Sequence, residues 1–342
     1  MQVAARLDLR ALGEFGLIEA IRRRAGDAGR AWRASIGDDG AVLRAREGRE
    51  LVLTADALVE DVHFRWRTTD ARSLGRKALA VNLSDLGAMG ATPLGFLLTL
   101  CLPGDPRAVS ARQLDGVLGG MLAEAKAAGC PLVGGDTVRA PCWSLQLTAV
   151  GDVPRGRALT RAGARPGDRL LVTGSLGGAA LGLRLLEAGR PLAGLLGGFA
   201  RRQILPRPPW RLGARLVRAR LATAAIDLSD GFALDLEHLT RQSRVAAEVQ
   251  VEALPLARGL RAACPELGLD PLQAALHGGE DYELLFCVPH GAPSARALSA
   301  RLGVRLSEVG VIRRGRGVRF LREGRPAGIP VGGYDHFKPS AS

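Results

Sequence analysis

The stretch DRLLVTGSLGGAALGLRLLEA, residues 168–188, decides the fold class of this sequence. Its beginning, Asp168–Thr173, contains a short apolar run that predicts a buried strand, and Ala179–Ala188 has the apolar spacing of a helix. The glycine-rich residues between them predict a tight strand-to-helix turn, a place where phosphate can lie. Because the glycine spacing differs from that of a dinucleotide-binding loop, the turn identifies no ligand.

Strands and helices alternate on both sides of this stretch, which predicts an α/β or α+β fold. Before it we expect strands at Glu50–Thr54, from Pro131 to Val133 and at Ser144–Val150, and helices at Arg72–Gly90 and Ala111–Ala128. After it we expect helices at Pro209–Arg220 and following Asp230, and strands at Ala247–Val251, Tyr282–Val288, Val309–Ile312 and Val318–Leu321. The turn-rich stretch Gly151–Gly167 predicts a boundary between two domains, residues 1–152 and 153–342.

The composition narrows the class of protein. With 342 residues and 47% hydrophobic content, the chain is long enough for two domains with buried cores. The best membrane candidate, Leu94–Leu102, is far too short to span a bilayer. Five scattered cysteines without a C-x-x-C pair favour reduced thiols, and hence a cytoplasmic location, over disulfides or a zinc site.

The net charge of +13 invites a nucleic-acid interpretation. The charge is almost entirely arginine, however, and it is spread along the chain rather than interleaved with aromatic residues, which make up only 4%. We therefore favour a solvated basic surface and expect no nucleic-acid partner.

Acidic residues beside glycine or a small hydroxyl residue recur six times, typically at the ends of predicted core elements. They are Gly37-Asp38-Asp39-Gly40, Thr54-Ala55-Asp56, Asn82-Leu83-Ser84-Asp85, Gly134-Gly135-Asp136-Thr137, Asp227-Leu228-Ser229-Asp230-Gly231 and Gly278-Gly279-Glu280-Asp281-Tyr282. A single motif of this kind is usually a turn or a helix cap. Six of them, at strand ends where α/β proteins form ligand sites, favour a functional cluster.

Converging carboxylates need a counter-charge, because two of them about 4 Å apart repel by roughly 4 kcal/mol at an effective dielectric constant near 20. A site made only of oxygen ligands suits Mg²⁺, and the lack of paired His or Cys spacing argues against zinc. Carboxylate-bound Mg²⁺ in turn suggests phosphoryl transfer. The sequence has neither a P-loop nor a G-x-S-x-G elbow, so it predicts neither a P-loop enzyme nor a serine hydrolase.

These motifs, in this order, resemble the thiamine-monophosphate kinases of the PurM-like superfamily. The resemblance extends over almost the whole chain, and its matching segments are GEF (13–15), IGDDGAVL (36–43), TADALVEDVHF (54–64), KALAVNLSDLGAMGA (77–91), GGDT (134–137), GRALTRAGARPGD (156–168), IDLSDG (226–231), HGGEDYELLF (277–286) and GYDHF (333–337). Where relatives often carry Thr, Thr and Leu, this chain has Ala55, Ala57 and Phe232. None of the three changes removes a side-chain ligand.

The resemblance implies a phosphotransferase that moves the γ-phosphoryl group of ATP onto thiamine monophosphate, giving thiamine diphosphate and ADP, with several Mg²⁺ ions and no covalent nucleophile. It also implies a homodimer formed through the N-terminal α/β domain, and a C-terminal α/β domain that closes the active-site cleft. Carried over by motif, the implied Mg²⁺ ligands are Asp39, Thr54, Ala55 through its backbone carbonyl, Asp56, Asp85, Asp136, Asp227 and Asp230. The implied ATP contacts are Gly135, Asp136, Arg161 and Ser229, and the implied thiamine contacts are His63, Glu280 and Tyr334.

Two alternatives stay open at this point. One is another ATP-using PurM-like enzyme, such as aminoimidazole ribonucleotide synthetase or selenophosphate synthetase. The latter needs a reactive cysteine or selenocysteine near its N-terminus, whereas the first cysteine here is Cys101. The other alternative is a non-catalytic protein that binds nucleotides or nucleic acid.

Overall fold

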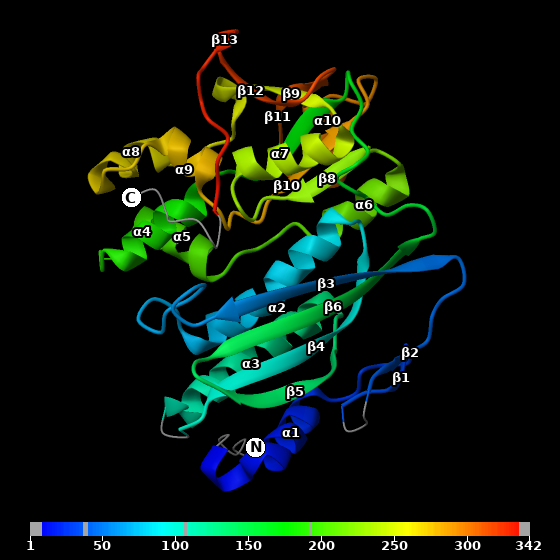
Figure 1. Cartoon of the computed structure of the whole chain (residues 1–342), viewed down its shortest axis with the longest axis vertical. Coiled ribbons are helices and arrows are strands. Elements are labelled where there is room, and N and C mark those ends of the chain that lie inside the picture. Colours follow the sequence, from blue (N-terminus) through cyan, green and yellow to red (C-terminus); the bar gives the residue numbers. More distant parts are fainter. Residues whose placement is uncertain (1–8, 37–39, 106–107, 192, 335–342) are drawn as a thin grey trace. The chain divides into compact units, whose positions relative to one another are not determined.

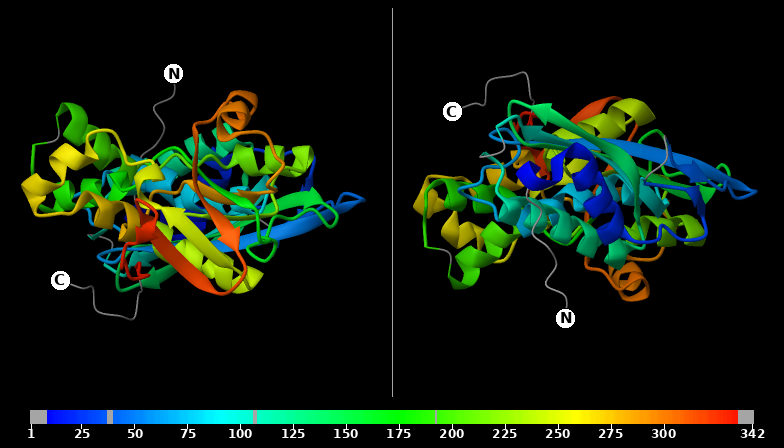
Figure 2. Two further views of the ribbon diagram at one scale, coloured as in Figure 1. Left: turned by 90° about the horizontal axis from the view of Figure 1, so that it is seen from above. Right: turned by 90° about the horizontal axis from the view of Figure 1, so that it is seen from below.

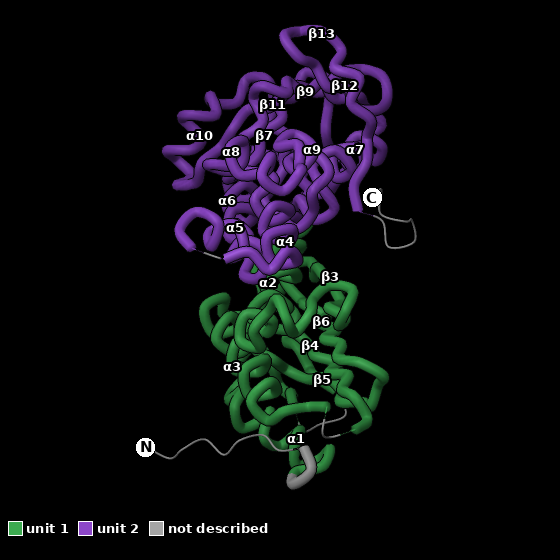
Figure 3. The backbone as a smooth tube through the Cα atoms, turned by 90° about the vertical axis from the view of Figure 1, so that its left-hand side faces the viewer, with its two compact units in different colours: residues 1–86, 92–156 green, residues 87–91, 157–342 purple. Residues whose placement is uncertain are grey.

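The computed structural model describes residues 9–36, 40–105, 108–191 and 193–334. The chain divides into two compact units, each built around its own sheet (Figures 1 and 3). Unit 1 comprises residues 1–86 and 92–156, and unit 2 comprises residues 87–91 and 157–342. No helix within the described ranges is long and apolar enough to cross a membrane.

Unit 1 centres on a four-stranded sheet with the order β3-β6-β4-β5. Its elements are α1 (Leu9–Ala25), β1 (Trp32–Ala34), β2 (Val42–Leu43), β3 (Arg49–Val59), α2 (Ala71–Ala88, whose last two residues belong to unit 2), β4 (Thr92–Pro103), α3 (Ala111–Ala128), β5 (Leu132–Ala140) and β6 (Ser144–Pro154). β6 pairs antiparallel with β3 and β4, and β4 pairs parallel with β5. Helix α3 begins with a capping box between Ser110 and Gln113 and ends at the left-handed Gly129, so the predicted range 111–128 is confirmed.

The two faces of this sheet differ in character. Helices α2 and α3 lie along one face (Figure 1), and the strand residues facing them, such as Leu98 and Leu145, are buried. On the other face Leu51 and Leu53 of β3 are 48% and 64% exposed. Because side chains alternate along a strand, β3 presents one row to the helices and the next row to the open face.

Unit 2 centres on a seven-stranded sheet with the order β13-β12-β9-β11-β7-β10-β8. Its strands are β7 (Arg169–Thr173), β8 (Ala224–Asp227), β9 (Ala246–Gln250), β10 (Leu284–Val288), β11 (Leu306–Arg313), β12 (Gly317–Arg322) and β13 (Arg325–Pro326). Its helices are α4 (Gly178–Glu187), α5 (Gly194–Ile204), α6 (Arg211–Ala219), α7 (Phe232–Ser243), η2 (Val251–Ala253), α8 (Leu260–Ala263), η3 (Pro265–Leu267), α9 (Pro271–His277) and α10 (Ala295–Leu302). β9 and β12 pair parallel, and the other pairs are antiparallel.

Two apolar clusters hold unit 2 together. The larger one joins the sheet to α7, for example through Leu285 of β10 and Leu236 of α7. The smaller one joins α4, α5, α8 and α9, which gather at one side of the unit (Figure 2). The predicted site residues of unit 2 lie near α7, α9 and the segment that precedes β10.

The α/β class is confirmed, and the differences from the predicted elements have physical causes. β10 begins at Leu284 rather than at Tyr282, because Glu280 and Tyr282 have left-handed backbones, with φ of 65° and 49°, that cannot continue a strand. The apolar run Leu94–Leu102 is the inner strand β4, which the sequence analysis did not assign.

Candidate functional site

One group of predicted site residues lies where β3 contacts α2 in unit 1. Thr54 and Asp56 are two positions apart on β3, so both belong to the half-buried row, whereas Ala55 between them is exposed on the open face. The Thr54 hydroxyl donates a hydrogen bond to the Asp85 carboxylate on α2. The strand and the helix thus bring together oxygen-bearing side chains that are 31 positions apart in sequence.

A second group lies on β5, at the opposite edge of the same sheet. Gly135 is paired with Leu98 and Asp136 with Thr99 on β4, and the Asp136 carboxylate accepts a hydrogen bond from the Thr137 N–H at 2.8 Å. Gly135 has a φ of 148°, and a Cβ there would lie 1.9 Å from the Leu98 carbonyl oxygen, so only glycine fits.

Asp56 and Asp136 do not meet within one chain. β6 and β4 separate their strands, which places the two backbones about 14 Å apart at three inter-strand spacings. Among the described residues no group of three or more His, Cys, Asp or Glu side chains is arranged to hold a metal ion. Asp39 lies outside the described residues.

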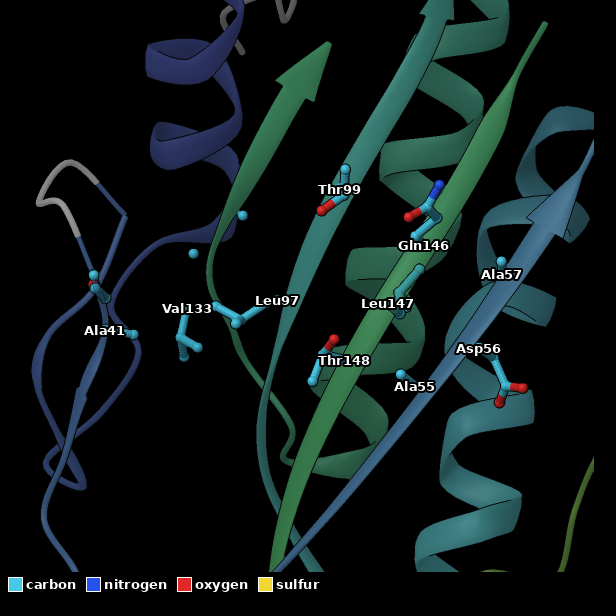
Figure 4. Close-up of a pocket in the computed structure, with 14 residues that line it drawn as sticks. Ala41, Ala55, Asp56, Ala57, Leu97, Thr99, Val133, Gln146, Leu147 and Thr148 are labelled. Carbon is cyan, nitrogen blue, oxygen red and sulfur yellow. The ribbon is translucent and has the colours of Figure 1, made fainter. Parts of the chain in front are cut away.

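A pocket of about 480 Å³ lies in unit 1 and opens on the sheet face that the helices leave uncovered (Figure 4). Its lining comes from β3, β4, β5 and β6 and from the segment that precedes β2: Ser35, Gly40, Ala41, Ala55, Asp56, Ala57, Leu97, Thr99, Val133, Gly134, Gly135, Gln146, Leu147 and Thr148. In Figure 4 Asp56 stands at one end of this lining, on β3, and Ala41 stands at the other end. The lining thus combines small and apolar side chains with the polar side chains of Ser35, Asp56, Thr99, Gln146 and Thr148.

The side chain of His63, a predicted substrate contact, binds the backbone of the turn in which it lies. Its ring Nδ1 accepts a hydrogen bond from the Val59 N–H at 3.1 Å. Between these two residues, Asp61 has a left-handed backbone. This contact fixes the direction of the imidazole ring at the end of β3.

In unit 2 the acidic loop after β8 is held by its backbone. β8 ends at the buried Asp227, and the next residues run beside the segment that leads into β10. Leu228 N–H donates to the Glu283 carbonyl at 2.8 Å, Tyr282 N–H donates to the Leu228 carbonyl at 2.8 Å, and Glu280 N–H donates to the Ser229 carbonyl at 2.7 Å. Two motifs more than 45 positions apart in sequence therefore form one hydrogen-bonded unit.

The chain's C-terminal segment lies against the same loop. The Tyr334 N–H donates to the Asp230 carbonyl at 3.0 Å, and the Tyr334 side chain is 48% exposed. Unit 2 thus brings together five predicted site residues: Asp227, Ser229, Asp230, Glu280 and Tyr334.

A third carboxylate, which is not among the predicted site residues, supports this loop. Asp235, in the first turn of α7, accepts hydrogen bonds from the Asp230 and Gly231 N–H groups, both at 3.1 Å, and is 2% exposed. Burial, together with the nearby charges of Asp230 and Asp227, raises the pKa of Asp235 to about 8. The buried Asp235 therefore fixes the backbone of the Asp230 loop.

In the glycine-rich turn before α4, a carboxylate binds two backbone N–H groups. Asp281 accepts from the Gly177 N–H at 2.7 Å and from the Ala179 N–H at 3.2 Å. Glu283 accepts from the Thr173 hydroxyl at 2.5 Å and from the Ser175 N–H at 3.2 Å. Burial raises the pKa of Asp281 to about 7, against the opposing effect of these backbone hydrogen bonds. The backbone of the turn therefore holds the side chains of Asp281 and Glu283 in place.

The side chain of Glu280, in the same motif, binds a residue of α5. Its left-handed backbone turns the side chain toward the end of α5, where the Gln203 amide donates a hydrogen bond to the carboxylate. Gln203 is 5% exposed. A buried amide on another helix therefore sets the direction of a predicted substrate contact.

Arg161 lies in the loop before β7, and its backbone carbonyl accepts a hydrogen bond from the Ser243 hydroxyl at 2.5 Å. The pKa of His238 on α7 is lowered mainly by burial, and further by the charges of Arg241 and Arg161, while Asp230 opposes the shift. Arg161 and Asp230 therefore act on the same imidazole.

The comparisons with known proteins identify the family of the chain. The family model "AIR synthase related protein, N-terminal domain" matches residues 37–153, and "AIR synthase related protein, C-terminal domain" matches residues 165–322. Thiamine-monophosphate kinase of Escherichia coli (strain K12) is 39% identical over 332 residues, which are 96% of this chain and 99% of the relative. The corresponding kinase of Mycobacterium tuberculosis (strain ATCC 25618 / H37Rv) is 37% identical over 84% of each chain.

Solved structures give the same result. Thiamine-monophosphate kinase from Stenotrophomonas maltophilia K279a has a TM-score of 0.80 and 41% identity, covering 92% of this chain and 98% of its own. AaThiL complexed with AMPPCP and TMP has a TM-score of 0.75 and 31% identity, covering 96% and 98%. With both AIR synthase related domains present and kinase relatives matched over nearly their full length, the chain belongs to the thiamine-monophosphate kinase family.

Proposed function

We propose that this protein transfers the γ-phosphoryl group of ATP to thiamine monophosphate, forming thiamine diphosphate and ADP. The observation that carries the proposal is the nearly full-length relationship to thiamine-monophosphate kinases, among them AaThiL, which was solved with AMPPCP and TMP. The loop of unit 2 that joins Asp230, Glu280 and Tyr334 supports it, because it presents acidic and aromatic groups together.

We assign the roles by segment. Thr54, Asp56 and Asp85 on β3 and α2, Asp136 on β5, and Asp227 and Asp230 after β8 are proposed Mg²⁺ ligands, together with Asp39 and the Ala55 carbonyl. Gly135, Asp136, Arg161 and Ser229 are proposed ATP contacts, and His63, Glu280 and Tyr334 are proposed thiamine contacts. Arg161 can offer a planar fork of donors to phosphate oxygens.

The donor set fits Mg²⁺. Its side chains are carboxylates and a hydroxyl, and the pKa of Asp235 beside them is raised first by burial and further by the negative charges of Asp230 and Asp227. When bound, Mg²⁺ supplies charge neutralisation between the two anionic substrates. The chain's own part is to hold these oxygens in place: Thr54 directs Asp85, and Asp235 secures the backbone of the Asp230 loop.

The proposed reaction is a direct in-line displacement. A phosphate oxygen of thiamine monophosphate attacks the γ-phosphorus of ATP, the bond from that phosphorus to the β,γ-bridging oxygen breaks, and ADP leaves with the electron pair. Positioning and neutralisation account for such a step without a covalent intermediate, so no side-chain nucleophile is required.

We further propose that two copies pair through the open sheet face of unit 1. Leu51, Leu53 and Val138 are exposed there, and such an apolar face favours a protein contact. Because β3 and β5 are opposite edges of one sheet, pairing is also a way for Asp56 of one copy to approach Asp136 of the other. The dimer would then complete each site.

Two further proposals concern the whole chain. We propose that residues 1–152 and 153–342 are separate domains, with the second closing the active-site cleft; limited proteolysis should then cut between residues 155 and 167. We also propose a cytoplasmic location, because all five cysteines are free thiols and four of them are buried.

The deciding experiment measures ADP release from ATP and Mg²⁺ with different acceptors. Thiamine monophosphate should stimulate release, whereas thiamine, formylglycinamidine ribonucleotide and selenide should not. Stimulation by thiamine would show that the acceptor need not carry a phosphate. Stimulation by either of the last two compounds, without an effect of thiamine monophosphate, would assign the chain to another reaction.

A further inference from the structure

The C-terminal segment reaches the acidic loop through a series of contacts within unit 2. In Figure 1 it is the red chain that follows β13 and runs back past α7. Ala327, Ile329 and Val331, at alternate positions, pack on the larger apolar cluster of unit 2. The segment ends, within the described residues, at Tyr334, whose N–H is bound to the Asp230 carbonyl.

A histidine makes a polar side-chain contact to this segment. The Nε2 atom of His277, the last residue of α9, lies 3.1 Å from the Pro330 carbonyl oxygen. A carbonyl oxygen can only accept, so Nε2 carries the hydrogen and donates. The bond joins residues 53 positions apart and lies four residues before Tyr334.

The same histidine is held from its own helix. Its Nδ1 lies 2.6 Å from the Gln273 side-chain amide, one helical turn earlier on the same face of α9. Gln273 can present either end of its amide to this nitrogen, so the contact is compatible with a ring whose Nε2 carries the hydrogen. The direction of the imidazole ring is thus set before it meets Pro330.

The backbone of His277 touches the acidic loop directly. A Cβ on Gly231 would lie 3.0–3.2 Å from the Cα, carbonyl carbon and carbonyl oxygen of His277. One residue therefore lies against the Asp230-Gly231 turn with its main chain and binds the C-terminal segment with its ring. His277 opens the motif HGGEDYELLF but has no role in the reaction as proposed above.

We propose that His277 is a positioning residue that fixes the C-terminal segment against the acidic loop and thereby sets the place of Tyr334 for the thiamine group. This inference rests on the proposed function for its kinetic consequence only. The Nε2–Pro330 bond restrains the segment four residues before Tyr334, whose side chain is 48% exposed. Loss of the Nε2–Pro330 bond removes one restraint on the segment that carries Tyr334 and broadens the positions of the ring.

Three variants separate the hydrogen bond from packing. His277→Phe keeps a ring and removes the donor, whereas His277→Gln keeps an N–H donor near the position of Nε2. His290→Phe is the matched control, because His290 is an exposed histidine in the turn after β10. The readouts are amide hydrogen exchange of residues 327–334 and separate KM values for thiamine monophosphate and ATP.

For His277→Phe we expect faster exchange at Tyr334 and a KM for thiamine monophosphate raised about 2- to 10-fold, the size of one ordinary hydrogen bond. The KM for ATP should stay within about 2-fold. His277→Gln and His290→Phe should behave as the parent does. In a Tyr334→Ala background, His277→Phe should produce no additional change in KM, because the histidine acts through that tyrosine.

Unchanged exchange at Tyr334 in His277→Phe would overturn the inference, whatever the kinetics. So would an equal loss of affinity for thiamine monophosphate in the parent and Tyr334→Ala backgrounds. A parent protein without thiamine-monophosphate kinase activity would overturn the proposed function instead, and the exchange measurement would still decide whether His277 anchors the segment.

Discussion

Gly333 lies so close to the Asp230 carbonyl oxygen that a Cβ at Gly333 would stand 2.6 Å from it. The neighbouring Gly332 has room: its Cβ would meet only the His277 ring carbon Cδ2, at 3.7 Å. Of these two adjacent glycines, only Gly332 has room for a larger side chain. Gly333 packs closely on the loop that carries the proposed metal ligand Asp230.

Gly333→Ala should therefore weaken the binding of thiamine monophosphate, since the new methyl group must displace either the C-terminal segment or the Asp230 loop. Overpacking of this kind costs roughly 1–3 kcal/mol, which corresponds to a KM increase of about 5-fold or more. Gly332→Ala is the control and should match the parent in steady-state kinetics. Equal behaviour of the two variants would argue against close packing of Gly333 on Asp230.

Asp85→Asn should abolish turnover without unfolding the protein. The Asn side chain keeps the shape and can still accept the Thr54 hydrogen bond, but it lacks the charge that a cation requires. We expect kcat to fall by roughly 100-fold or more, with a thermal midpoint within a few degrees of the parent. Thr54→Val, which removes the donor that directs Asp85, should have a smaller effect than Asp85→Asn. Full activity of Asp85→Asn would remove this residue from the proposed metal site.

Asp281 should make the parent protein lose stability as the pH rises. Its pKa is raised from 3.8 to about 7, so the folded state binds a proton that the unfolded state releases near pH 4. The stabilisation by the protonated form is complete below about pH 4 and is lost as the pH passes through 7. Asp281→Asn lacks this titration, so the parent's advantage in unfolding free energy should be greater at pH 5 than at pH 8.5. Urea unfolding of both proteins at the two pH values measures this difference in unfolding free energy. A difference that does not change with pH would contradict the raised pKa of Asp281.

Leu53→Asp should dissociate the proposed dimer. Leu53 is 64% exposed on the open face of unit 1, and a carboxylate there would have to be buried without a partner when two faces pair. Light scattering after size-exclusion chromatography should show a shift from dimer to monomer, with loss of activity. Leu195→Asp, a change at a 51% exposed leucine of α5, is the matched control and should leave the mass unchanged. A monomeric parent would refute the proposed pairing outright.

The sequence predicts an element or a site most accurately where the residues that indicate it are close together in the chain. The predicted range of helix α3 equals its observed bounds, because apolar residues recur at helical spacing along it and Gly129 marks its end. Asp227, Ser229 and Asp230 were recognised together because they share one loop at the end of a strand. Strand β4 was missed, since its apolar run lacks the alternation that identifies half-exposed strands.

The supporting residues of the site left little trace in the sequence. Gln203 and Asp235 act through bonds to Glu280 and to the Asp230 loop, and nothing in a helical stretch indicates which polar side chain turns inward. The Asp281 carboxylate binds the glycine turn before α4 although it lies 104 positions from Gly177, and no local pattern in the sequence indicates this contact. For His277 a signal existed, namely its place at the head of the motif containing Glu280.

The placement of β3 and β5 at opposite margins of one sheet has a genetic consequence if two copies share their sites. Asp56→Asn and Asp136→Asn would each inactivate both sites of their own homodimer. In a mixed dimer, however, one site would receive both altered residues and the other would receive neither. Co-expression of the two inactive forms should therefore restore up to about half of the activity per hybrid molecule, as intragenic complementation.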